Sequence, residues 1–131
     1  VVIDAGSPVT GATALHQAAA GGHAGLIAHL IRRGASVDAV DGDGATPLVY
    51  AAYQGREKAV AALLDAGARV DVLPFRQVHA LNAAVLSGVP GVVRRLVEAG
   101  AMPDLDDAWG KDARDYVVQT GRQELASLWS G

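Results

Sequence analysis

The chain has 131 residues, half of them hydrophobic and only 5% aromatic, and it carries a net charge of −3. This length suits one compact domain, and the acidic balance is unlike that of nucleic-acid-binding proteins, which present a clustered basic face. Because the sequence contains no cysteine, disulfides, thiolate metal sites and cysteine nucleophiles are excluded.

No apolar run approaches the roughly 20 residues that a helix needs to span a membrane. The chain begins with Val1 and shows no signal peptide. We therefore expect neither a nucleic acid nor a membrane as partner, and we favour a cytoplasmic monomer. These observations leave open that a signal peptide was removed from an upstream segment.

The sequence repeats itself every 33 residues. The stretch Thr-Ala-Leu-His-Gln-Ala-Ala at 13–19 aligns with Thr-Pro-Leu-Val-Tyr-Ala-Ala at 46–52 and with His-Ala-Leu-Asn-Ala-Ala-Val at 79–85. Apolar positions recur in the same register, among them Leu26, Ala59, Val92 and Leu125. So do glycines, namely Gly22, Gly55, Gly88 and Gly121. This pattern indicates four copies of one unit rather than an isolated helix.

Each copy is predicted to form a short helix, a tight turn, a second helix and an extended turn. In the second copy Thr46 is a good N-cap and Pro47 suits the first helical position, so the short helix should reach about Tyr53. A second helix is expected over about 57–65. Glycines are well placed to end the second helices in the left-handed conformation, at Gly34, Gly67 and Gly100. One pair of helices cannot bury its own apolar face, so the copies must stack.

The chain resembles ankyrin repeats in four stretches: Thr-Ala-Leu-His at 13–16, Gly-His at 22–23, Gly-Ala-Ser-Val-Asp-Ala at 34–39 and Gly-Ala-Thr-Pro-Leu at 44–48. The resemblance covers about residues 8 to 129. It implies an all-α solenoid of stacked helix-turn-helix units joined by β-hairpin-like turns. The expected repeats are 8–40, 41–73, 74–106 and 107–131, and residues 1–7 form a tail or the remnant of a preceding repeat.

The third and fourth copies depart from the family pattern. Residues 74–79 read Pro-Phe-Arg-Gln-Val-His, so we expect a reshaped turn in which His79 replaces the capping threonine. In the fourth copy Arg114 stands where the family prefers leucine, which predicts altered packing. Trp129 falls on a leucine position and is expected in the core, and Tyr50 and Tyr116 are also expected to pack.

No combination of residues indicates catalysis or a cofactor. His16 and His23 stand where ankyrin repeats carry histidine, and the resemblance implies that the first ties loops together through hydrogen bonds. The acidic residues Asp104, Asp106 and Asp107 lack the ligand pattern of an EF-hand. The serines lack the context of a nucleophile elbow. We predict a protein that is not an enzyme and holds no cofactor or metal.

Ankyrin domains bind proteins through their hairpin tips and the exposed side of the first helices, which together form a concave face. Carried over to this chain, the resemblance places Phe75 and Trp109 on tips and Tyr53 and Leu86 on helices. Aromatic residues and arginine are the usual energetic anchors of an interface. The predicted partner-binding residues are Asp43, Tyr53, Gln54, Phe75, Arg76, Val78, Leu86, Trp109 and Lys111. An inward-folded Phe75 that fills the reshaped turn is the alternative.

The resemblance thus implies a non-catalytic protein-interaction module or scaffold with an unidentified protein partner. One alternative is a regulatory ankyrin segment of a larger enzyme or multidomain protein. Another is a small-molecule or metal site in the reshaped third copy. An engineered binder is disfavoured, because engineered repeats are nearly identical and these copies diverge.

Overall fold

The computed structural model describes residues 5–7, 11–74 and 78–129, and within these ranges all regular elements are helices. The predicted all-helical fold is therefore confirmed, and the two helices predicted in the second copy end where α3 and α4 end. In chain order the helices are α1 (Ala14–Gly21), α2 (Ala24–Arg32), α3 (Pro47–Tyr53), α4 (Glu57–Asp65), α5 (Ala80–Ser87), α6 (Pro90–Glu98), α7 (Ala113–Thr120) and the 3-10 helix η1 (Gln123–Leu128).

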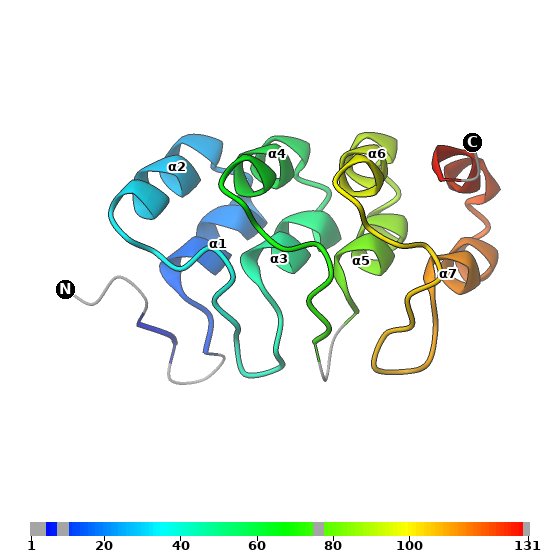
Figure 1. The fold of residues 1–131 in the computed structure, drawn as a ribbon, viewed down its shortest axis with the longest axis horizontal. Coiled ribbons are helices and arrows are strands. Elements are labelled where there is room, and N and C mark those ends of the chain that lie inside the picture. Colours follow the sequence, from blue (N-terminus) through cyan, green and yellow to red (C-terminus); the bar gives the residue numbers. More distant parts are fainter. Residues whose placement is uncertain (1–4, 8–10, 75–77, 130–131) are drawn as a thin grey trace.

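The helices lie in two rows (Figure 1). One row holds α1, α3, α5 and α7, and the other holds α2, α4 and α6 with η1 at its end. Each helix packs on the next member of its own row. The turns that precede the first-row helices project together from the side facing away from the second row. We call the first row together with these turns, which include 41–46 and 107–112, the inner face.

The first-row helices all begin at a capping side chain. The side chains of Thr13, Thr46 and Asp112 each accept the backbone N–H three residues later. His79 does the same through its ring, since the N–H of Asn82 donates to His79 Nδ1 at 3.4 Å. Each cap satisfies an N–H that has no acceptor within its helix. The prediction that His79 substitutes for a capping threonine is confirmed.

The core lies between the two rows and repeats with the sequence. Leu15, Leu48 and Leu81, one from each of the first three copies, are at most 1% exposed. The small side chains of Ala19 and Ala52 are fully buried where neighbouring helices meet. Because the buried residues recur unit by unit, stability comes from contacts between neighbours rather than from one central core.

The last unit differs from the others, as its sequence predicts. Arg114 is exposed on α7 rather than packed like a leucine, and its guanidinium lies 2.6 Å from the Asp112 carboxylate. The second helix of this unit is only the short η1. Trp129, expected in the core, is half-buried at the end of η1 and packs against the core from its edge. A terminal unit is expected to be atypical because one of its faces meets water.

Glycines with left-handed backbone conformations end the second helices and the short turns. Gly67, after α4, has φ of +89°, which agrees with the predicted helix stop. Gly55, in the turn between α3 and α4, has φ of +69°, and a Cβ placed there would lie 2.7 Å from Val89 Cγ2. Gly55 is thus required both by its backbone conformation and by the close approach of the next unit.

We expect Gly55→Ala to lower the free energy of unfolding by about 2 kcal/mol, because it adds a clash with Val89 to the strain of a left-handed alanine. Gly67→Ala is the matched control: a Cβ there meets no atom within 4 Å. The control should cost about 1 kcal/mol from backbone strain alone. Urea unfolding measures both, and equal losses would show that the Val89 contact contributes nothing.

Candidate functional site

The first-row helices present few large side chains on the inner face. Leu48 and Ala51 of α3 are buried in the core. Tyr53 is 52% exposed, and Gln54, at the end of the helix, is also exposed. Leu86 holds the position equivalent to Tyr53 one unit later, on α5, and is half-buried. Because α3 and α5 pack side by side, these two positions belong to adjacent helices.

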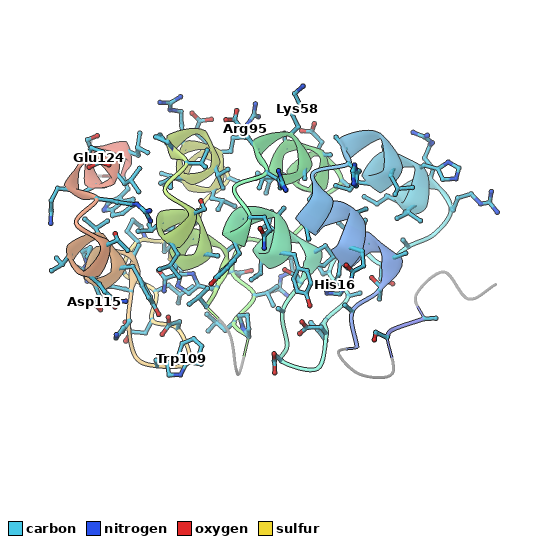
Figure 2. The ribbon with its side chains drawn as sticks, turned by 180° about the vertical axis from the view of Figure 1, so that it is seen from behind. His16, Lys58, Arg95, Trp109, Asp115 and Glu124 are labelled. Carbon is cyan, nitrogen blue, oxygen red and sulfur yellow. The ribbon has the colours of Figure 1, made fainter. Side chains whose placement is uncertain are left out.

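Trp109 and Lys111 lie on the turn that precedes α7. Trp109 is 57% exposed at the tip of this turn (Figure 2). The Lys111 ammonium donates to Gln119 Oε1 at 3.1 Å and lies 5.8 Å from the centre of the Tyr116 ring. These two contacts hold the positive charge of Lys111 against α7.

The buried carboxylate of Asp107 holds the turn that carries Trp109. Asp107 Oδ1 accepts the backbone N–H groups of Trp109 at 2.9 Å and Lys111 at 3.1 Å. Asp107 Oδ2 accepts the Tyr116 hydroxyl at 2.5 Å and Asn82 Nδ2 at 3.3 Å. Four donors thus converge on one side chain that is 9% exposed, which fixes the shape of the tip.

The turn that precedes α3 is built in the same way. Asp41 Oδ1 accepts the backbone N–H groups of Asp43 and Ala45, both at 2.9 Å, and Asp41 Oδ2 accepts the Tyr50 hydroxyl. Asp43, a predicted partner-binding residue, is half-buried at this tip. The two turns therefore share one design, an aspartate clamped by a tyrosine from the following helix.

The sequence analysis missed this pairing, because it predicted only a packing role for Tyr50 and Tyr116. The packing role is correct for Tyr116, which is 5% exposed, but its hydroxyl also closes a hydrogen-bond network. The available signal was the spacing: each tyrosine follows its aspartate by nine residues, and the second pair repeats the first after two periods.

Val78 does not join the inner face as expected. Val78 is only 4% exposed, so its side chain belongs to the core and not to a binding surface. The cause is its register, since the equivalent Ala45 is also fully buried. Phe75 and Arg76 lie outside the described residues.

His16 ties neighbouring turns together, as the resemblance implied. Its Nε2 donates to the carbonyl oxygen of Ala45 at 2.8 Å, 29 residues along the chain. Its Nδ1 accepts the backbone N–H of Thr13 at 3.0 Å, so the ring is a neutral tautomer in this network. Burial lowers the pKa of His16 and outweighs the Ala45 hydrogen bond and the Asp41 charge, which act in the opposite direction.

The two clamped aspartates are more acidic than usual. Burial alone would raise the pKa of each carboxyl group, but the tyrosine hydroxyl and two backbone N–H groups outweigh it and lower the pKa below 3.8. A carboxylate whose pKa is depressed on folding stabilises the fold above its unfolded value. That contribution disappears as the pH falls through the lower, folded value.

We expect the urea midpoint of unfolding to decrease steeply below about pH 4, because the unfolded chain then binds protons at Asp41 and Asp107 while the folded chain keeps both carboxylates ionised. Replacing both tyrosines, Tyr50→Phe with Tyr116→Phe, should raise both carboxyl pKa values and flatten this decrease. Midpoints measured between pH 7 and pH 3 test the expectation. An unchanged slope in the double variant would show that the hydroxyls do not set the acidity.

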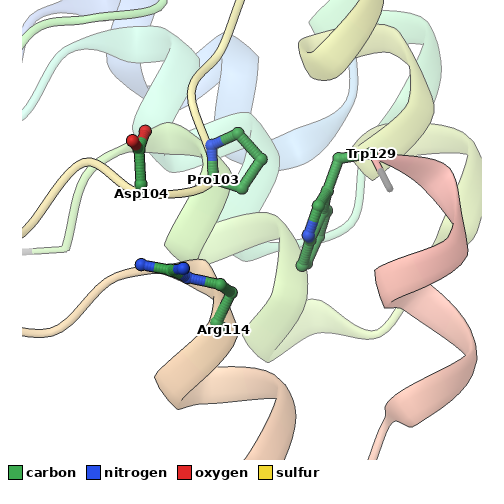
Figure 3. A pocket seen from close by; sticks show the side chains of 4 residues that line it. All are labelled: Pro103, Asp104, Arg114 and Trp129. Atoms are coloured by element: carbon green, nitrogen blue, oxygen red, sulfur yellow. The ribbon is translucent and has the colours of Figure 1, made fainter. Parts of the chain in front are cut away.

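Within 5–7, 11–74 and 78–129, no group of three or more His, Asp or Glu side chains is placed to hold a metal ion. An open hollow lies beside η1, lined by Pro103, Asp104, Arg114 and Trp129 (Figure 3). Its charged guanidinium is already paired with Asp112. No helix in the described part of the chain is long and apolar enough to cross a membrane.

Comparison with known proteins agrees with this geometry. A family model described as ankyrin repeats (3 copies) matches residues 2–73. No curated protein matches the chain. Ankyrin repeats are in general protein-protein interaction modules and are typically non-catalytic. Because the match covers more than half of the sequence, and the helices stack in the same 33-residue register, this chain belongs to the ankyrin repeat family.

Proposed function

We propose that this chain binds a partner protein through its inner face and performs no catalysis. The observation that carries the proposal is the exposure of Tyr53 and Trp109, at 52% and 57%, on a surface that otherwise carries few large side chains. Large aromatic side chains cost little conformational entropy when they become ordered, and they dominate the energetics of many interfaces. Their exposure on a rigid stack supports a binding role.

Binding would bury Tyr53 and Leu86 on adjacent helices and Trp109 on the neighbouring turn. Lys111, whose ammonium is oriented by Tyr116 and Gln119, would pair with an acidic group of the partner. The clamp formed by Asp107 keeps the Trp109 turn in one shape, which reduces the entropy lost on binding. Both the helical residues and the turn residues of the inner face are therefore held in place before a partner binds.

We expect the double variant Tyr53→Ser/Trp109→Ser to capture the partner from an extract of the source cells at least about tenfold less efficiently than the wild-type chain. The reason is that it removes two exposed aromatic anchors without touching the core. Immobilised chains followed by quantitative mass spectrometry provide the measurement.

Met102→Ser is the matched control. Met102 is 50% exposed, but it lies on the turn after α6, away from the inner face. The Met102→Ser chain should capture the partner as efficiently as the wild-type chain. Equal capture by all three chains would contradict the proposed face, and a loss confined to Met102→Ser would move the site to the turn after α6.

A further inference from the structure

Three short segments connect the second-row helices to the turns of the following units. They are 38–40, 71–73 and 104–106, and they hold the same register in the 33-residue repeat. Figure 1 shows each connection descending from the second row to the next turn. The backbone N–H of Arg69 donates to Asp38 Oδ1 at 3.1 Å, which joins the first connection to the second. We call the three segments the connector strip.

Two large apolar side chains are exposed at equivalent positions of the connector strip. Val40 is 54% exposed and Leu73 is 53% exposed. In the second segment Asp71 and Leu73 are exposed, whereas Val72 between them is half-buried, and the third segment alternates in the same way. This alternation is that of an extended strand. The strip therefore presents apolar side chains to solvent on neighbouring segments, as interaction surfaces do.

The connector strip is acidic as well as apolar. It carries four aspartates and no basic residue, and the aspartates are Asp38, Asp71, Asp104 and Asp106. Within the described residues, only Asp71 of these four forms an ion pair, with the adjacent Arg69 at 3.3 Å. Four negative charges and one positive charge leave a net charge of −3, as large as that of the whole chain. Electrostatic complementarity then requires a basic partner.

An open hollow at the third segment adds an aromatic wall to the strip. Its lining residues are Pro103, Asp104, Arg114 and Trp129 (Figure 3). The hydrogen bond and the charge of Asp112, followed by the charges of Asp104 and Asp115, raise the pKa of Arg114. This guanidinium thus lies among three aspartates, so the surroundings of the hollow are acidic. A further cationic side chain could contact the Trp129 ring and pair with Asp104.

We propose that the connector strip docks an extended, basic segment of a partner protein that also carries apolar side chains. The apolar side chains would cover Val40 and Leu73, and the cationic side chains would pair with the aspartates of the strip. One cationic side chain would enter the hollow beside Trp129. This site is separate from the inner face and does not depend on the function proposed for that face.

A synthetic peptide of repeated Arg-Arg-Leu-Leu units tests the docking, because each side of its extended chain alternates cationic and apolar side chains. Two control peptides replace the leucines with serine or the arginines with glutamate. NMR titration of the isotope-labelled chain measures the affinities. The first peptide should bind at least about tenfold more tightly than either control. It should shift the amide signals of the connector strip more than those of α3 and α5.

Two double variants test the residues of the strip. Leu73→Ser/Asp104→Asn removes one exposed apolar and one exposed acidic side chain, and it should weaken binding of the first peptide at least about tenfold. Leu26→Ser/Glu124→Gln is the matched control, since Leu26 is 46% exposed on α2 and Glu124 is exposed on η1. This control should bind the peptide as the wild-type chain does. The inner-face variant Tyr53→Ser/Trp109→Ser should bind it equally well.

Equal affinities for the three peptides would overturn the proposal, and so would equal binding by the two strip and control variants. Shifts confined to the inner face, or binding lost in Tyr53→Ser/Trp109→Ser, would place the peptide on the inner face and overturn it too. Signals of the strip that broaden with protein concentration in the absence of peptide would show that a second copy occupies the strip. That result would equally contradict the proposed occupant.

Discussion

Replacing Asp107 with alanine is expected to lower the free energy of unfolding by about 3 kcal/mol. The buried carboxylate accepts hydrogen bonds from the backbone of Trp109 and Lys111 and from the side chains of Tyr116 and Asn82. Alanine leaves the two backbone N–H groups and the Tyr116 hydroxyl without this acceptor in a place that water reaches poorly. An unsatisfied buried donor costs about 1–3 kcal/mol, so the loss of several should make this one of the costliest polar changes in the chain.

Two further variants show which interactions account for the loss of stability in Asp107→Ala. Tyr116→Phe removes one of the four donors and should cost about 1 kcal/mol. Asp106→Ala removes the exposed neighbouring carboxylate and should change stability by less than about 0.5 kcal/mol. Urea unfolding at pH 7 measures all three. If Asp107→Ala were as mild as Asp106→Ala, the clamp would not contribute to the stability of the turn.

The clamp also links stability to the proposed function. Asp107 does not reach the exposed surface of the inner face, but it fixes the turn that presents Trp109. A variant with a loosened turn would have to order it again on binding, and that cost reduces affinity. The Tyr116→Phe chain, which should remain folded, is therefore expected to capture the partner less well even though its exposed aromatic residues are intact.

The fold was predictable from sequence because its determinants are local and repeat four times. A capping residue and a proline at the first helical position mark the start of α3, and glycines follow the ends of α3 and α4. Each signal lies within a few residues of the feature it controls. His79 could be recognised as a cap from its register alone. The periodic leucines then determine which side of each helix is buried.

The candidate site was less predictable because exposure depends on neighbouring units. Val78 lies near a turn tip in sequence, but the stack buries it as it buries Ala45. Each aspartate–tyrosine clamp joins a turn residue to a helix residue. The residues next to Asp41 in the sequence do not indicate that its partner is Tyr50.

Replacing His16 with alanine is expected to lower the free energy of unfolding by about 3–4 kcal/mol. His16 is fully buried, donates to the Ala45 carbonyl and accepts from the Thr13 backbone. Its ring also meets Tyr50 edge-on, with ring centroids 4.8 Å apart. Alanine would remove a bridge between two turns, leave a carbonyl unpaired and open a cavity beside the tyrosine.

The chain itself provides the conservative replacement. Asn82 holds the position equivalent to His16, and its Nδ2 donates to the carbonyl of Lys111 at 3.0 Å, as His16 donates to Ala45. His16→Asn should therefore keep the bridge and cost only about 1 kcal/mol. A loss as large as that of His16→Ala would show that the ring packing, rather than the bridge, stabilises the first interface.

The same asparagine variant separates the charge of His16 from its hydrogen bond. Because burial lowers the pKa of His16 below 6.5, the unfolded chain binds a proton more readily than the folded one. Wild-type stability should then begin to fall as the pH drops below about 6.5, well above the range in which the aspartates titrate. Asparagine has no such proton, so His16→Asn should remove this first decline and keep the second. Urea midpoints between pH 7.5 and pH 5 measure the difference, and parallel curves for the two chains would mean that another group causes the decline.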